Sequence, residues 1–271
     1  DALLLSIFPG TVNIDIAYTP RFDPDRYIRG ERLSYWNPLL GRLAGRDAIV
    51  SPIIPDRWFE DDELALRLSK NIAGYELALY GYDGFWKSPA GFEPLAGQAT
   101  FPKLSVYGAS LRGNIGPGIG HTEFGYYDSR QDKEGSDPFI PNSEARFMAG
   151  YEQEVFRNVT LGGQYYLEVL QDYDNYLASL APGQPSRDEY RHLLTVRLTW
   201  MLMSQNLRLS FFGYYSPSDR DSYLRPAINY KLTDAWQLTA GANLFNGDKP
   251  NTFFGQFENN SNVYAGIRYS F

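Results

Sequence analysis

Apolar and polar residues alternate strictly along residues 261–271, which read SNVYAGIRYSF. Val263, Ala265, Ile267, Tyr269 and Phe271 fall on one face of an extended strand, and the residues between them fall on the other. A period of two places successive side chains on opposite faces of a strand. This segment therefore predicts a strand whose two faces meet two different environments.

Alternating segments of the same kind recur throughout the chain and predict thirteen strands. Many of them have about the 9–11 residues that a tilted strand needs to cross a bilayer. The predicted strands are 2–8, 11–19, 62–70, 74–83, 103–113, 119–129, 143–156, 159–171, 190–203, 207–215, 222–232, 236–245 and 261–271.

The connections between these strands alternate in length without exception. The short turns are 8–10, 70–74, 114–118, 157–158, 204–206 and 233–235. The long polar connections are 20–60, 84–102, 130–142, 171–189, 216–221 and 246–260. Short periplasmic turns that alternate with longer external loops are typical of outer-membrane barrels.

The chain ends in Tyr269 and Phe271, and its last strand resembles the closing strand of a Gram-negative outer-membrane β-barrel. In that class a terminal aromatic residue, most often phenylalanine, is the signal that the barrel-assembly machinery reads. The resemblance implies a porin-like protein of the bacterial outer membrane, in contact with membrane lipid and lipopolysaccharide, with Tyr269 and Phe271 as its assembly signal. It does not identify one family of barrels.

We therefore predict a single transmembrane antiparallel β-barrel of twelve or more strands over residues 1–271. The predicted strand count is odd, whereas bacterial single-chain barrels have even numbers. Either the chain lacks N-terminal strands of a larger barrel, or segment 2–8 is a periplasmic extension of a twelve-stranded one. A soluble sheet that rests its apolar face on a core is the alternative fold, which the charged residues in mid-strand on the opposite face disfavour.

Composition supports this fold and excludes several functions. Aromatic residues make up 16% of the chain, with 21 Tyr and 17 Phe, and Trp200, Trp236 and Tyr75 lie beside short turns, where a periplasmic aromatic girdle is expected. No run of about 18 apolar residues exists, so membrane-spanning helices are excluded. The net charge of −7 argues against nucleic-acid binding. The absence of cysteine excludes disulfides and covalently attached haem.

The polar faces of the predicted strands carry many charges, which are the candidate lining of a pore. Acidic residues concentrate on 119–171, and basic residues on 190–232 and at 268. Neighbouring strands lie about 4.8 Å apart, so the charges form patches. Patches that face each other across a barrel would orient charged solutes; alternatively, they are salt bridges that fill a narrow lumen. The candidates are Glu144, Arg146, Glu152, Glu168, Arg191, Arg197, Arg208, Arg225, Lys231 and Arg268, with Asp15, Arg67, Glu76 and Glu123 on the earlier strands.

The connection 20–60 is the longest and contains seven arginines together with aromatic and aliphatic residues. A loop of this length is usually functional or disordered, and its apolar content argues against disorder. We expect it to fold into the lumen and constrict it, to cap the mouth, or to dock a partner protein.

The sequence gives little support for a catalytic site or a metal site. Strand geometry places no serine beside His121 or His192, and a nucleophile needs a base within hydrogen-bond reach. The Asp-rich segment 218–221 does not match a calcium-binding loop. The chain is therefore predicted not to be an enzyme and to need no cofactor or metal.

The predicted function is passive passage of small hydrophilic solutes through a charged lumen. The alternative is a structural barrel that sheathes or docks a partner, for example a multihaem cytochrome in an electron conduit.

Single-cysteine variants test the predicted faces, and the cysteine-free chain provides a clean background. A membrane-impermeant thiol reagent should label cysteines that line the lumen and spare those that face lipid, because lipid excludes the reagent. Labelling is expected at 197, 239 and 268, with protection at 196, 238, 263, 265 and 267. Efficient labelling at 263, 265 and 267 with protection at 268 would show that the register is wrong.

Overall fold

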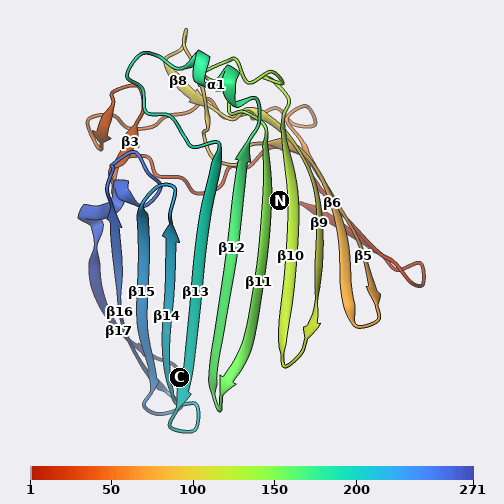
Figure 1. Ribbon diagram of the computed structural model, residues 1–271, viewed down its shortest axis with the longest axis vertical. Helices are drawn as coiled ribbons and strands as arrows, with labels where there is room; N and C mark the ends of the chain where they lie inside the picture. Colours follow the sequence, from red (N-terminus) through yellow and green to blue (C-terminus); the bar gives the residue numbers. More distant parts are fainter. Residues whose placement is uncertain (1) are drawn as a thin grey trace.

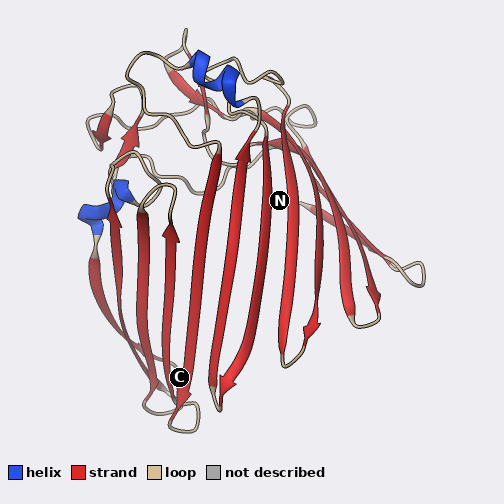
Figure 2. Ribbon diagram, in the orientation of Figure 1, coloured by secondary structure: helices blue, strands red, loops and turns tan. Residues whose placement is uncertain are grey.

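A single thirteen-stranded antiparallel sheet dominates the computed structural model, which describes residues 2–271 (Figures 1 and 2). The strands pair in sequence order, β1-β2-β5-β6-β9-β10-β11-β12-β13-β14-β15-β16-β17, so that β1 and β17 each have one partner and every other strand has two. The bounds are β1 Leu3–Ile7, β2 Asn13–Thr19, β5 Glu63–Ile72, β6 Tyr75–Phe85, β9 Lys103–Ile115, β10 Gly118–Ser129, β11 Glu144–Phe156, β12 Val159–Leu170, β13 Tyr190–Leu202, β14 Leu207–Ser216, β15 Asp221–Lys231, β16 Trp236–Gly247 and β17 Asn262–Tyr269.

The thirteen strands correspond to the thirteen predicted segments, with ends that shift by a few residues. Residues Leu3–Ile7 pair with β2, so segment 2–8 is a strand of the sheet and not a separate extension. The short turns lie together with the C-terminus at one end, and the long connections gather at the other (Figure 1). Ala73 and Gly74 have φ angles of 51° and 86°, as the tightest hairpin turns require. The predicted alternation of short and long connections is confirmed except between β14 and β15, where the connection 217–220 is as short as the turns 203–206 and 232–235.

The long connections contain short elements that the sequence pattern did not predict. The connection 20–62, which we call the strap, contains the hairpin β3 (Tyr35–Asn37) and β4 (Arg42–Ala44). A second hairpin, β7 (Gly91–Glu93) and β8 (Gln98–Thr100), lies between β6 and β9. The helices α1 (Tyr173–Ser179) and η1 (Gly255–Asn260) precede β13 and β17. Strands of three residues and helices of six or seven residues are too short to show a clear period.

Within residues 2–271, no helix combines the length and the apolar character that a membrane span requires.

The strand register places the predicted apolar residues on one face of the sheet, which we call the outer face. Leu161 lies opposite Leu198, and Leu238 lies opposite Ile267. Many of these side chains are exposed, among them Ile267 with 71% of its surface accessible. Exposed apolar surface costs about 25 cal/mol per Å² in water, so a face of this kind belongs against lipid. The opposite face, with the charged candidates, is the inner face.

Pro226 interrupts the pairing of β15 with β16, as its missing N–H predicts. The two strands pair at Leu224 with Leu244 and again at Ala227 with Gly241, but not at Arg225 and Pro226 between them. The register is the same on both sides of the gap, so the proline removes a hydrogen bond without shifting the strands.

A cluster of buried aromatic side chains lies at the base of the strap. Phe22 packs on Phe85 and Phe101 with ring centroids 5.1 and 5.0 Å apart, and Tyr27 adds an edge contact to Phe101. Lys87 lies over the Phe22 ring and donates a 2.6 Å hydrogen bond to the buried Glu63. The strap is therefore anchored on the ends of β6 and β9.

Asp61 fixes the point where the strap returns to the sheet. Its carboxylate accepts hydrogen bonds from the backbone N–H of Arg57 at 3.0 Å and from the Arg57 guanidinium at 3.1 Å. These contacts, with that from the guanidinium the largest, hold the pKa of Asp61 below its ordinary value although burial opposes them. The carboxylate is therefore charged at neutral pH and stabilises this turn of the strap.

The strap crosses the end of the sheet instead of staying beside its own strands. It leaves β2 near one edge, and the backbone N–H of Trp36 donates a 3.0 Å hydrogen bond to Gln256 in η1, beside the opposite edge. Figure 1 shows β3 above the ends of β15 and β16, and β3 contacts η1. The strap therefore caps the end of the sheet where the long connections gather, which we call the mouth.

Candidate functional site at the mouth

A cavity of about 1170 Å³, the mouth cavity, lies between the inner face and the long connections. Tyr82, Tyr127, Arg146, Glu168 and Arg191 line it from the strands. The connections contribute Trp36 from the strap, Trp86, Arg187, Asp219 and Phe253. The strands thus supply charged residues on one side of the cavity, and the connections supply aromatic residues and further charges on the other side.

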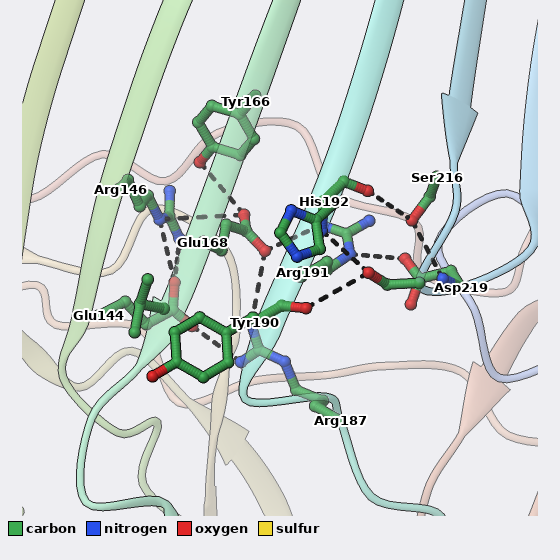
Figure 3. A network of polar contacts seen from close by, with 12 residues as sticks. Glu144, Arg146, Tyr166, Glu168, Arg187, Tyr190, Arg191, His192, Ser216 and Asp219 are labelled. Carbon is green, nitrogen blue, oxygen red and sulfur yellow. Dashed lines mark hydrogen bonds and ion pairs between the residues drawn. The ribbon is translucent and has the colours of Figure 1, made fainter.

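Glu144 is the most deeply buried acid of this site, with 2% of its surface accessible. One carboxylate oxygen accepts hydrogen bonds of 2.7 and 3.0 Å from Arg146, and the other accepts one of 2.8 Å from Arg187 (Figure 3). A buried carboxylate is stable only when its charge and its lone pairs are matched in this way. Glu144 thereby ties the loop residue Arg187 to β11.

Glu168 extends the network to the next strands. It accepts a hydrogen bond of 2.9 Å from Arg191 and one of 3.2 Å from the Tyr166 hydroxyl. Arg191 also donates to Asp219 and, at 3.1 Å, to the Tyr214 hydroxyl. The network therefore runs from β11 through β12 and β13 to the connection between β14 and β15 (Figure 3).

Backbone contacts hold Asp219 in place. The Ser216 hydroxyl donates to the carbonyl of His192 at 3.1 Å and accepts from the Asp219 N–H at the same distance. The N–H of His192 donates to the Ser218 hydroxyl at 3.0 Å. The ring of His192 contacts the Tyr165 hydroxyl on the outer face.

Aromatic rings cover the arginines on the cavity side. The guanidinium of Arg146 lies 3.9 Å from the ring centre of Tyr127, which stacks on Trp86. Arg191 lies 6.0 Å from the ring centre of Phe253. Cation–π contacts of this kind hold guanidinium planes in fixed orientations. The mouth therefore presents flat, rigid walls to a solute.

The charges of the network cancel, which corrects one sequence-based expectation. Acidic and basic residues were expected on separate walls, but at the mouth Glu144 and Glu168 are ion-paired with Arg146, Arg187 and Arg191. The alternative of lumen salt bridges therefore describes this end. The same holds on the earlier strands, where Arg67 pairs with Asp15 at 3.4 Å and Glu76 at 2.7 Å.

The remaining candidate residues lie below the mouth and are not brought into the network. Arg197, Arg208, Arg225 and Arg268 are exposed on the inner face, and in the part of the chain that the structure describes none has an ion pair or a side-chain hydrogen bond. We call these four residues the basic ladder. Glu152 is also exposed without an ion pair there, and Lys231 pairs at 2.7 Å with Asp234 in the exposed turn.

The strand register places two residues of the basic ladder at the same level along the strands. Arg197 lies opposite Phe212 on β14, and Phe212 lies opposite Arg225 on β15. Two strand spacings separate the two arginines, about 10 Å. On the other side of Arg197 the row continues through Gly162 to Glu152.

Sequence reasoning missed the loop residues of the site. Arg187, Asp219, Trp86 and Phe253 belong to connections without a period, so no pattern indicated that they turn toward the strands. The one available signal was charge matching: the acids predicted on β11 and β12 needed cations if they were to be buried. Among the described residues, no group of three or more His, Asp or Glu side chains could hold a metal ion.

Comparison with known proteins identifies the fold. No protein-family model and no curated protein sequence matches the chain. A porin structure refined at 1.8 Å resolution matches with a TM-score of 0.50 and 10% identity, over 96% of this chain and 80% of the porin. The fold is that of a porin β-barrel. The outer membrane channel DcaP of Acinetobacter baumannii matches with a TM-score of 0.38 and 11% identity, over 96% of this chain and 98% of DcaP.

The porin match confirms the predicted fold class, a transmembrane antiparallel β-barrel of twelve or more strands. Barrels of this type belong to the outer membrane, in agreement with the location predicted from the last strand. Tyr269 packs on Trp236 at the short-turn end with ring centroids 4.8 Å apart, and the role of Tyr269 and Phe271 as an assembly signal stays a prediction.

Replacing Arg187 tests whether it ties the loop around α1 to the sheet. Arg187→Gln removes the hydrogen bond to Glu144, which should cost about 1–3 kcal/mol of local stability. Chymotrypsin should then cleave faster at Tyr173 and Tyr176, while the strands stay intact. Arg220→Gln is the control, because Arg220 is an exposed loop arginine with a 4.0 Å ion pair. Equal cleavage of wild type and Arg187→Gln would contradict the role of Arg187.

Proposed function

We propose that the protein is a passive outer-membrane channel for small hydrophilic solutes, with the inner face of the sheet as its path. The observation that carries this proposal is the basic ladder: exposed, unpaired arginines line the inner face below a mouth where charges are paired. Unpaired charges on an inner wall require water around them, and a water-filled lumen is a conduction path.

The mouth cavity is the narrow part of this path. Trp36 and Pro38 of the strap and Arg146 and Arg191 of the strands line the same cavity. A solute that enters therefore passes between the strap and a wall of neutralised ion pairs. We infer that the mouth selects mainly by size and shape, because the charges on its strand wall are paired with one another.

The basic ladder below the mouth supplies charge selectivity. Arg197 and Arg225 flank Phe212 at one height, and Glu152 is the acid of that row. Clefts lined by one sign of charge concentrate the opposite ion, and salt screens the effect over about 10 Å at 0.1 M. The channel should therefore favour anions, most strongly at low ionic strength.

A second function, a structural barrel that docks a partner protein, is favoured by the surface of the strap. Leu39, Trp58 and Phe59 expose 58%, 58% and 69% of their surface. Exposed apolar residues at a membrane-protein mouth suit contact with another protein. In this case the inner charges would contact the partner, and the lumen would not conduct.

Charge reversal in the basic ladder tests the channel. The double variant Arg197→Glu, Arg225→Glu should shift the reversal potential in bilayer recordings toward cation selectivity, most strongly at low salt, because the local field changes sign. Arg220→Glu makes the same kind of change in an exposed external loop and should shift it far less. A wild-type barrel that inserts but does not conduct would replace the channel by the structural function.

Excision of the strap hairpin tests the constriction. The N–H of Val50 donates a 2.9 Å hydrogen bond to the carbonyl of Arg29. Residues 31–48 therefore form a loop whose two ends are adjacent, so that a short linker can replace it. Replacing 31–48 by two glycines should raise single-channel conductance, because the excised residues include Trp36 and Pro38 of the mouth cavity. Shortening the turn of the β7–β8 hairpin at 94–97 is the control. Unchanged conductance would favour the docking role.

A further inference from the structure

A second cavity of about 810 Å³ lies among the long connections, outside the inner face. The strap, the β7–β8 hairpin, the connection between β10 and β11, and the connection around α1 each form part of its wall. The space is partly open to solvent and is much larger than the voids that close packing leaves. We call it the apolar chamber.

No charged side chain lines the apolar chamber, in contrast to the mouth cavity. Its walls are formed largely by aliphatic and aromatic residues, including Ile28, Val50, Phe92 and Phe139. A charged molecule that entered would lose part of its hydration and find no counter-ion, which is costly. The chemistry of the wall therefore selects an uncharged ligand.

Hydrogen bonds between the connections hold the chamber open. Ile53 donates its N–H to the carbonyl of Ala99 at 2.9 Å, and Phe92 donates to the carbonyl of Phe139 at 3.0 Å. The rings of Phe92 and Phe139 pack with centroids 5.7 Å apart. Since three separate connections are tied together in this way, the space exists before any ligand arrives.

Two glutamines supply the free polar groups of the wall. Gln98 donates its Nε2 to the carbonyl of Ser51 at 3.0 Å, which leaves its Oε1 without a side-chain or backbone partner in residues 2–271. Gln184 accepts the N–H of Ala181 with its Oε1 at 3.3 Å, which leaves its Nε2 likewise free. Tyr35 and Asn37 bond to each other. The free amide atoms of the two glutamines offer one acceptor and one donor on a largely apolar wall, beside the hydroxyl of Ser51.

We propose that the apolar chamber is a binding site for a small, uncharged, mainly apolar molecule with a hydrogen-bonding group. Its volume and its few polar groups match those of typical ligand pockets. Trp36, Pro38, Ala90 and Pro138 line both the chamber and the mouth cavity. A bound molecule therefore sits beside the solute path.

A pair of fluorescent probes tests the proposal. N-phenylnaphthylamine is neutral with one N–H, and anilinonaphthalene sulfonate carries the same rings with a fixed negative charge. Each is titrated into the protein in lipid nanodiscs, and the signal of empty nanodiscs is subtracted. The neutral probe should show saturable binding to wild type, about tenfold tighter than the charged probe.

Variants that fill the apolar chamber test whether the neutral probe binds there. Ala99→Trp places an indole in the chamber and should weaken binding of the neutral probe by about tenfold or more. Ala96→Trp adds the same side chain to the same hairpin outside the lining and should bind as wild type does. Ala181→Trp fills the chamber from the α1 connection and should reproduce the loss, so that a misfolded hairpin is not mistaken for a filled site.

Three results would overturn the proposal: no saturable signal above empty nanodiscs, equal affinity for both probes, or wild-type binding by both Ala99→Trp and Ala181→Trp. Conductance of the same nanodisc-derived protein is measured separately in bilayers. A non-conducting barrel that binds the neutral probe would refute the channel and leave the chamber standing.

Discussion

The structure depends on one constraint: in hydrocarbon, every backbone N–H and C=O must find its partner within the sheet. The eleven strands between β1 and β17 meet it on both sides by antiparallel pairing in sequence order, whereas β1 and β17 each pair on one side in the described residues. The pairing in turn fixes which side chains meet lipid and which meet the lumen. If the register slipped by one residue, Arg197 would take the place of Val196 on the lipid face. The strict alternation of apolar and charged residues is the consequence, and even Pro226 interrupts the ladder without shifting it.

Access to water explains why the inner charges behave in two ways. At the mouth the connections cover the sheet, and the buried Glu144 and Glu168 are each held by arginines. Below the mouth no connection covers Arg197 and Arg225, and they stand exposed without partners. A covered charge needs a counter-charge, whereas an uncovered one is solvated. The same inner face therefore carries paired charges at the mouth and unpaired charges below it.

The connections make a second layer of structure above the sheet. Phe22, Phe85 and Phe101 form a small buried core there, and Trp36 joins the strap to η1 across the mouth. This layer encloses two cavities of opposite character that share Trp36 and Pro38. One is lined by paired charges and aromatic rings, and the other by apolar side chains, so one mouth presents two chemistries to molecules that approach it.

The period of two determined the strands, their faces, the alternation of turns and the outer-membrane class, because each of these depends on residues that are close together in the sequence. Glu144, Arg146, Glu168 and Arg191 were recognised as inner residues for the same reason. Tertiary structure alone decided that Arg187 and Asp219 complete their network, that the strap crosses the mouth to Gln256, and that Arg197, Phe212 and Arg225 share one height. The contacts of Arg187, Asp219 and the strap join residues far apart in sequence through loops without a period, and their energy comes from burial and charge pairing that exist only after the strands are in register. The common level of Arg197, Phe212 and Arg225 depends on the register of the strands.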